Sequence, residues 1–295
     1  MFTGTAGLHL RRAVKLAINH RQERRAIIRG YGFDMLGRFT PWLGVTGEGM
    51  TFIVPSTDQV VGRQTFARAA FDLEFMDAAI ALVRAECGES VKDRIFLDVG
   101  ANIGTSAVAA LVRFGASRVV AVEPEENNLR LLRANLALNG LHDRADIHEV
   151  ALSNRSEVGR LGLSPDNPGD HRVSADTSRV GVEISLRQFG DLPLEIDDVG
   201  LVWMDVQGHE GHVFDGAGLS LDGVPVVTEF WWDVMNQNGG LPMFADALRR
   251  RRGIIDIRSA MATGTASITG PNEVDALLDS LRHKITDLLL LPRVG

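Results

Sequence analysis

The segment from Arg94 to Gly104 constrains the fold of this chain more than any other. The apolar residues 95–97 are followed by an acid, Asp98, and then by two glycines within six residues. A helical pattern begins directly afterwards, at Thr105. This order predicts a strand, a tight turn and a helix. Such a turn is the place where a parallel α/β sheet binds nucleotides.

The residues of the turn indicate which kind of nucleotide it suits. Gly100 and Gly104 have no Cβ atom, so a ligand can approach the backbone, and the first N–H groups of the next helix are unpaired. The Asp98 carboxylate favours a ligand with positive charge and hydrogen-bond donors. The spacing Asp98-x-Gly100-x-Asn102-x-Gly104 differs from the Gly-x-Gly-x-x-Gly fingerprint of dinucleotide sites and suits the sulfonium and amino-acid part of S-adenosylmethionine. Glu123 ends the next predicted strand, where a carboxylate pairs with two ribose hydroxyls.

Strand and helix patterns alternate through the rest of the chain. We expect strands at residues 95–97, 119–122, 145–152, 158–163, 180–186, 199–204, 224–230, 254–258 and 286–291, and helices at 66–85, 105–114, 127–139, 244–252 and 274–283. Strand–helix–strand units require right-handed crossovers, so the chain is expected to form an α/β fold with a parallel sheet. We divide it into an N-terminal cap or lid segment, residues 1–65, and a main domain, residues 66–295. The polar segment 164–178 is expected to be a substrate loop.

Composition excludes several classes of protein. The 295 residues carry a net charge of −7, which argues against a broad nucleic-acid-binding surface. The single cysteine, Cys87, rules out an internal disulfide and fits a reducing compartment. No apolar run approaches the roughly 20 residues of a membrane span, and the N-terminus lacks a signal-peptide profile. We therefore expect a cytoplasmic protein without a transmembrane segment.

The N-terminal segment is strongly basic. Residues 8–29 hold seven arginines and lysines against one acid, Glu23, with apolar residues at roughly helical spacing. We favour a solvated helix that covers the main domain. A helix on an anionic lipid surface, or one that contacts a partner or a second copy of the chain, is the alternative.

Several acids lie at or near the ends of predicted strands. Asp98, Glu123, Asp205 and Glu229 lie at strand ends, and Ala151 lies near the end of another strand. Ligands of open α/β sheets bind beyond the carboxyl ends of the strands. These residues are therefore expected to converge on one pocket.

These motifs together resemble one known family. They are Leu97-Asp98-Val99-Gly100-Ala101-Asn102-Ile103-Gly104, Val122-Glu123-Pro124, Asn135 and Asn139, Ala151-Leu152-Ser153, Asp205-Val206-Gln207-Gly208-His209-Glu210 and Glu229. The chain resembles the FkbM family of S-adenosylmethionine-dependent methyltransferases over residues 66–230, and residues 287–292 look like that family's last strand. The resemblance implies a class I methyltransferase fold with a Rossmann-like sheet of seven strands, the last antiparallel. It also implies methylation of a hydroxyl on a sugar, glycoside or natural-product small molecule.

The resemblance also assigns the cofactor site. The residues expected to bind S-adenosylmethionine are Asp98, Gly100, Asn102, Gly104, Glu123, Ala151, Leu152 and Asp205. The chain departs from the family pattern near the substrate, because Trp203 stands where the family usually has Lys and Gln207 where it usually has Glu. Arg187 likewise replaces the usual Asp after Leu186. These changes remove one cation and two carboxylates.

Transfer of a methyl group to an alcohol needs a base near the acceptor oxygen, which contributes roughly 10²- to 10⁴-fold to the rate. Asp205 and Glu210 are candidates, because their carboxylates follow the fourth strand of the expected sheet. His171, next to an acid in the polar loop, is another candidate. His209 is also a candidate base. A capping role at the next helix is the alternative for Asp205.

We expect no metal site. The spacing of His209 and His212 lacks the two residues between Glu and the second His that the zinc-protease motif requires. A Mg²⁺ ion held by Asp205, Glu210 and Glu229 is the alternative, since oxygen ligands suit it. The missing acid at Gln207 makes that alternative the weaker one.

Three other functions remain open. One is a nucleotide-dependent oxidoreductase on a related sheet, against which the spacing of the turn and Asp98 argue. Another is a binding module that keeps the cofactor pocket and has lost catalysis through the changes at Trp203 and Gln207. A third is a methyltransferase that acts on a nitrogen atom of a small metabolite.

Overall fold

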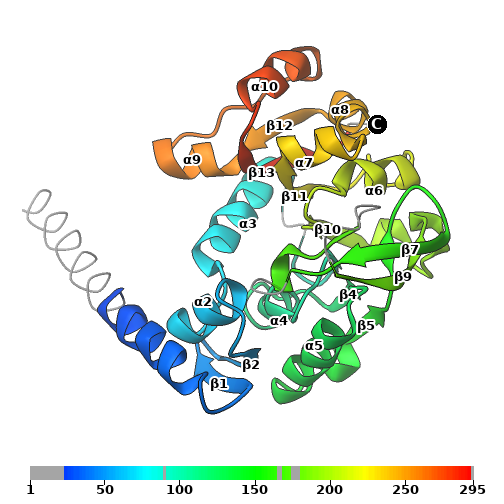
Figure 1. Ribbon diagram of the computed structural model, residues 1–295. Coiled ribbons are helices and arrows are strands. Elements are labelled where there is room, and N and C mark those ends of the chain that lie inside the picture. The colour runs from blue at the N-terminus through cyan, green and yellow to red at the C-terminus, as the bar shows by residue number, and fades with distance from the viewer. Residues whose placement is uncertain (1–22, 89–90, 165–167, 174–179, 294–295) are drawn as a thin grey trace, which may run out of the picture. The chain divides into compact units, whose positions relative to one another are not determined.

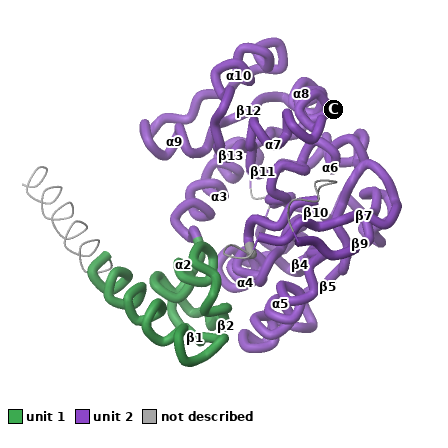
Figure 2. The backbone as a smooth tube through the Cα atoms, viewed as in Figure 1, with its two compact units in different colours: residues 1–71 green, residues 72–295 purple. Residues whose placement is uncertain are grey.

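The computed structural model describes residues 23–88, 91–164, 168–173 and 180–293. Within it the chain forms two compact units, residues 1–71 and residues 72–295 (Figure 2). Figure 1 labels their helices and strands. No helix in the described part of the chain is both long enough and apolar enough to cross a membrane.

The first unit contains a helix, a hairpin and a second helix. The helix over residues 23–36 precedes strands β1 (Trp42–Gly47) and β2 (Met50–Pro55), and helix α2 (Val61–Arg68) follows them. The strands pair antiparallel, and the two residues of their turn, Glu48 and Gly49, both have positive φ, as the favoured two-residue hairpin turn requires. Phe33 and Phe52 are buried, so they contribute to the apolar core of this unit.

The second unit is built on a seven-stranded sheet. The strand order is β12 (Gly253–Asp256), β13 (Ile285–Leu291), β11 (Val226–Trp231), β10 (Val199–Met204), β3 (Ile95–Val99), β4 (Arg118–Val122) and β5 (Ala145–His148). Neighbouring strands from β11 to β5 pair parallel, whereas β13 is antiparallel to both of its neighbours. The α/β fold with a seven-stranded sheet and an antiparallel last strand is thus confirmed.

Helices connect and cover these strands (Figure 1). They are α3 (Leu73–Cys87), α4 (Thr105–Val112), α5 (Glu126–Leu138), α6 (Glu210–Ala217), α7 (Trp232–Gln237), α8 (Gly240–Arg249), α9 (Ile257–Thr263) and α10 (Val274–Ser280). Short 3-10 helices are η1 (His142–Arg144), η2 (Pro168–Asp170), η3 (Phe189–Asp191), η4 (Ile196–Asp198) and η5 (Pro271–Glu273). Strand order reverses direction between β3 and β10, since the chain builds β4 and β5 on one side of β3 and β10 and β11 on the other. An open sheet binds ligands at such a switch point.

The expected strand over residues 145–152 is wrong. Its first half is β5, the edge strand of the main sheet, and its second half, β6 (Ala151–Leu152), pairs with β9 (Gly181–Arg187) in a separate sheet. That four-stranded sheet has the order β6, β9, β7 (Glu157–Gly162) and β8 (Arg172–Val173). His148 is the last residue of β5 that pairs with β4, and the residues after it pair with β9 instead.

Two further element predictions are wrong at their boundaries. The expected helix 66–85 is two helices, because Ala69 and Asp72 between them both have positive φ. The expected strand 254–258 ends at Asp256, whose carboxylate accepts the Ser259 N–H at 2.9 Å and starts α9 there. A local side-chain cap therefore outweighs the β-prone run of the sequence.

Two predictions fall partly outside the described residues. In the expected substrate loop 164–178, the described part forms η2 and β8, and residues 165–167 and 174–179 lie outside it. Of the expected basic helix 8–29, residues 23–29 belong to a helix and residues 8–22 lie outside the description.

Candidate functional site

The carboxyl ends of the central strands lie at the same level. Val99, the last residue of β3, is opposite Met204 on β10 and Val122 on β4. Backbone hydrogen bonds continue past these residues: the Asp205 N–H donates to the Val99 carbonyl at 2.9 Å, and the Gly100 N–H donates to the Val122 carbonyl at 2.9 Å. Parallel pairing therefore brings the acids after these strands to one edge of the sheet.

The first acid of this edge, Asp98, is buried, with 1% of its surface exposed. The Ser106 hydroxyl donates a 2.6 Å hydrogen bond to Oδ2, whereas Oδ1 is buried and has no partner among the described residues. Burial raises the pKa of Asp98 to about 7, against the opposing effect of the Ser106 hydrogen bond. Asn102, in the same turn, also has a buried side-chain oxygen that finds no partner in the part of the chain that the structure describes. Two unsatisfied acceptors fit a ligand that brings donors and positive charge, such as an ammonium group.

The glycine of this turn has a different role from the expected one. Gly100 has a φ of +89°, and a Cβ atom there would lie 1.9 Å from the Asp205 carbonyl oxygen. The missing side chain therefore makes room for the protein's own backbone at the end of β10. Glycine is required at position 100 because the ends of β3 and β10 meet there. From the sequence alone we expected a different reason, the access of a ligand to the backbone.

Glu123, after β4, is held by backbone groups. Its Oε2 accepts the Asn102 N–H at 2.9 Å and its Oε1 accepts the Glu125 N–H at 2.9 Å. Burial raises the pKa of Glu123 to about 7, although these N–H groups favour the charged form. The contact with Asn102 joins the turn after β3 to the end of β4.

The remaining acids form a tight cluster. Single carboxylate oxygens of Asp205, Glu210 and Glu229 all lie within 4.8 Å of one another. The Gln207 amide bridges two of them, donating to Asp205 at 2.5 Å and to Glu229 at 3.2 Å. Chemically, such a group of oxygens attracts cations and can serve as the ligand set of a divalent metal ion.

The pKa values of Glu210 and Glu229 are raised strongly within this cluster. Burial, together with the Asp205 charge, raises the pKa of Glu210 to about 8 and that of Glu229 to about 10. Oε1 of Glu210 accepts the N–H groups of Val206 at 3.0 Å and Gly208 at 3.3 Å, whereas its Oε2 is buried and no described residue bonds to it. Glu210 thus shapes the loop after β10 by accepting both of these N–H groups.

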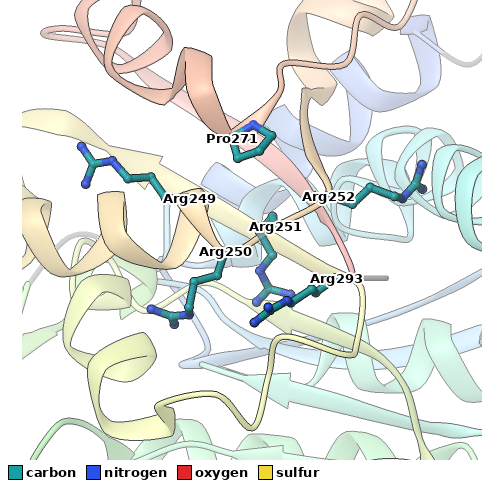
Figure 3. A pocket seen from close by; sticks show the side chains of 6 residues that line it. All are labelled: Arg249, Arg250, Arg251, Arg252, Pro271 and Arg293. Atoms are coloured by element: carbon teal, nitrogen blue, oxygen red, sulfur yellow. The ribbon is translucent and has the colours of Figure 1, made fainter. Parts of the chain in front are cut away.

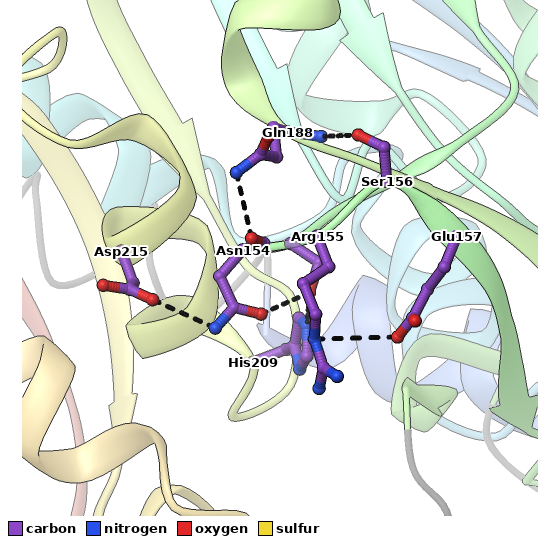
Figure 4. Close-up of polar contacts among 8 residues, drawn as sticks. Asn154, Arg155, Ser156, Glu157, Gln188, His209 and Asp215 are labelled. Carbon is purple, nitrogen blue, oxygen red and sulfur yellow. Dashed lines mark hydrogen bonds and ion pairs between the residues drawn. The ribbon is translucent and has the colours of Figure 1, made fainter.

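Ala151 and Leu152 lie in β6 of the small sheet, and the segment that follows them is tied to helix α6. Figure 4 shows the polar contacts of this segment, in which Asn154 donates to Asp215 of α6 at 3.0 Å and accepts from Gln188 through its carbonyl. The Ser153 hydroxyl contacts Nε2 of His209 at 2.9 Å, and burial lowers the pKa of His209 to about 3. His209 is consequently neutral and supports the loop after β10.

His171 precedes β8. Its Nδ1 accepts a hydrogen bond from the Ser164 N–H at 3.0 Å, so the proton of the neutral ring sits on Nε2. In this arrangement Nε2 is a donor, which weakens the case for His171 as a base. The next residue, Arg172, places its guanidinium 4.2 Å from the centre of the Trp231 ring. Burial raises the pKa of Glu229, and the charge of Arg172 partly opposes that rise. Arg172 thereby links the loop that carries His171 to the acid cluster.

The sequence argument missed two residues of this region. The first is Ser106, which bonds to Asp98. It follows Asp98 by eight residues and lies at the start of the helix after the turn, and this position in the sequence could have identified it. The other is Asp287, which lies opposite Glu229 on β13 and has its pKa raised to about 6, chiefly by burial. Only the pairing of β13 with β11 reveals it. Trp203, in place of the family's lysine, packs against the rings of Phe75 and Phe96.

The chain is similar to several known methyltransferases. Residues 98–249 match the model of the methyltransferase FkbM domain family. The 2-O-methyltransferase NoeI of Sinorhizobium fredii is 28% identical over 173 residues, which cover 52% of this chain and 69% of that protein. The tRNA wybutosine-synthesizing protein 2 homolog of Rattus norvegicus is 32% identical over 98 residues, 32% of this chain and 22% of that protein.

Among solved structures, the methyltransferase FkbM from Methylobacillus flagellatus is 14% identical with a TM-score of 0.43. The similarity covers 77% of this chain and 52% of that chain, so this chain spans about half of that structure. The geranyl diphosphate C-methyltransferase from Streptomyces coelicolor is 14% identical with a TM-score of 0.41, covering 75% of this chain and 80% of that one.

Proposed function

The chain belongs to the FkbM family of S-adenosylmethionine-dependent methyltransferases, and from that premise we propose that the group it methylates is a hydroxyl of a small molecule. The acceptor is a sugar, a glycoside or a related natural product. The observation that carries this proposal is the meeting of Asp98, Glu123 and Asp205 at the carboxyl edge of one parallel sheet. The similarity to a protein named 2-O-methyltransferase supports transfer to oxygen.

The proposed cofactor contacts follow from the chemistry of each group. Asp98 and Asn102, with their unpartnered buried oxygens, bind the ammonium end of S-adenosylmethionine. Glu123 pairs with the ribose hydroxyls. Gly100 and Gly104 shape the turn beneath the ligand, and Ala151, Leu152 and Asp205 line the rest of the site.

Asp205 is the proposed base. It follows β10 at the switch point of the sheet, where the donor methyl group and the acceptor meet, and its carboxylate belongs to a cluster of acids. An in-line displacement requires the acceptor oxygen to lie opposite the sulfur, and a nearby carboxylate both orients the hydroxyl and takes its proton. Glu210 holds the loop that carries Asp205 and is an alternative base. His171 is a further candidate, weakened because its Nδ1 already accepts the Ser164 N–H.

Methyl transfer is tested directly with S-adenosylmethionine that carries a labelled methyl group. The full chain is incubated with a panel of methyl acceptors that contains hydroxyl compounds, including sugars and glycosides, and matched amines. We expect label in an alkali-stable ether of a hydroxyl compound, with formation of one S-adenosylhomocysteine per methyl group. Label found only on nitrogen would contradict the proposal and favour the N-methyltransferase alternative. Tight binding of S-adenosylhomocysteine with no turnover on the whole panel would favour the silent binding module.

Cofactor binding is expected to weaken in acid. Since Asp98 has a pKa of about 7 in the free protein and must be ionised to pair with an ammonium group, lowering the pH from 8 to 6 removes most of its charge. We expect the affinity for S-adenosylhomocysteine, measured calorimetrically, to fall about tenfold across this range, because the ionised fraction drops by about that factor. The variant Asp98→Asn should bind more weakly at pH 8 and depend less on pH. A wild-type affinity that stays constant from pH 8 to 6 would contradict the role of Asp98.

A further inference from the structure

A second polar site lies at the opposite edge of the sheet. Four consecutive arginines, residues 249–252, join the end of α8 to β12, and together with Arg293 and Pro271 they line a pocket (Figure 3). Gly253, which begins β12, pairs with Leu291 near the end of β13. Because β12 runs parallel to β11 and β10, this pocket lies at the amino edge of the parallel strands. The acid cluster lies at their carboxyl edge.

Three of these arginines already have acidic partners. Arg249 contacts Asp275 at 2.6 Å, Arg250 contacts Asp222 at 3.0 Å, and Arg252 lies 3.7 Å from Glu86. These pairs hold the pocket wall in place. None of the acids belongs to the lining itself, which consists of five arginines and one proline.

Arg251 differs from these three. It is only 2% exposed, and its Nη1 donates to the carbonyl groups of Leu221 at 2.8 Å and Val224 at 3.0 Å. Its Nε and Nη2 are buried and have no hydrogen-bond partner in the described part of the chain. A buried guanidinium with two unmet donors is costly, since buried charges are normally paired.

The unpaired atoms form one particular edge of the guanidinium. Arg63 uses its Nε and Nη2 to bind both oxygens of Asp34 at 2.9 Å each. Arg113 uses the same two atoms to bind both oxygens of Asp77 at 2.7 Å each. Arg251 offers this two-pronged edge, and no described residue binds to it. The edge matches the oxygens of a carboxylate or a phosphate group.

We propose that the arginine pocket binds an oxyanion of the phosphate class, with Nε and Nη2 of Arg251 donating to two of its oxygens. A doubly charged anion suits the pocket better than a carboxylate, because two of its five arginines, Arg251 and Arg293, have no ion-pair partner among the described residues. Arg293 is exposed and lines the same pocket, so it supplies a second positive charge (Figure 3). The bound group lies away from the methyl-transfer site and takes no part in the reaction.

Calorimetric titration of the full chain with sodium phosphate tests this site. The titration is run at low millimolar concentrations, with sodium chloride keeping the ionic strength constant. We expect saturable binding at one site per chain and weaker binding of acetate. The variant Arg251→Lys keeps the charge but lacks the two-pronged edge, and is expected to lose about tenfold or more in affinity. Arg293→Gln, at an exposed position, should also weaken binding, whereas Arg130→Gln on α5 should leave it unchanged.

The outcomes distinguish loss of the phosphate site from misfolding of the variant and from failure of the proposed methyl-transfer function. Each variant is also titrated with S-adenosylhomocysteine, whose binding should remain at the wild-type level. Absence of saturable phosphate binding in the wild type would overturn the proposal. So would an affinity that is the same in Arg251→Lys, or tighter binding of acetate than of phosphate. If Arg251→Lys does not fold, Arg293→Gln decides, because an exposed side chain can be removed without loss of the core.

Discussion

Replacing Asp205 by asparagine is expected to reduce methyl transfer by roughly 10²- to 10⁴-fold, the usual contribution of a general base. The substitution keeps the shape of the side chain and an oxygen that can accept from the Gln207 amide, but it removes the charge that takes the proton of the acceptor. The rate is measured with labelled S-adenosylmethionine under saturating cofactor.

The controls for this prediction separate catalysis from binding. Affinity for S-adenosylhomocysteine should change far less than the rate, because Asp98 and Glu123 make the principal proposed cofactor contacts. Asp215→Asn, which alters an acid of α6 that contacts Asn154, should transfer methyl groups at the wild-type rate. Wild-type activity in Asp205→Asn would exclude Asp205 as the base and leave His171 and Glu210 as candidates.

The substitution Gly100→Ala is expected to damage both stability and cofactor binding. The added Cβ would meet the Asp205 carbonyl oxygen at 1.9 Å, and the residue would keep a φ of +89°, which disfavours any side chain. Overpacking against the backbone and this conformational strain together cost about 2–4 kcal/mol. In a domain of this size that lowers the melting temperature by about 5–15 °C. Loss of S-adenosylhomocysteine binding should accompany it, because β3 and β10 must separate at the site.

A matched variant isolates the clash from the conformational strain. Gly140 also has a positive φ, +68°, but no atom lies within 4 Å of the position of its missing Cβ. Gly140→Ala should therefore show the conformational cost alone, about 1–2 kcal/mol, with cofactor binding intact. Equal melting temperatures for the two variants would contradict the assigned role of Gly100.

Local patterns predicted the parts of the fold that depend on neighbouring residues. The strand, turn and helix around Asp98 and Gly104 were predicted because apolar runs and glycines signal them directly. Acids that follow parallel strands were expected to share one edge, and the register of β3, β4 and β10 brings them there. Predictions failed where a local contact outweighed the pattern, as at Asp256, or where the chain changed sheets, as after His148.

The sequence by itself determined the family, the cofactor and the order of the acidic strand ends, because these depend on short motifs whose spacing is visible in the chain. Only the tertiary structure decided that Gly100 faces the Asp205 carbonyl and that Asp287 lies opposite Glu229. It also decided that the two-pronged edge of Arg251 has no partner within the described ranges. Each of these depends on segments far apart in the chain. The packing of strands and loops brings them together, and no local pattern records which distant residue a side chain will meet.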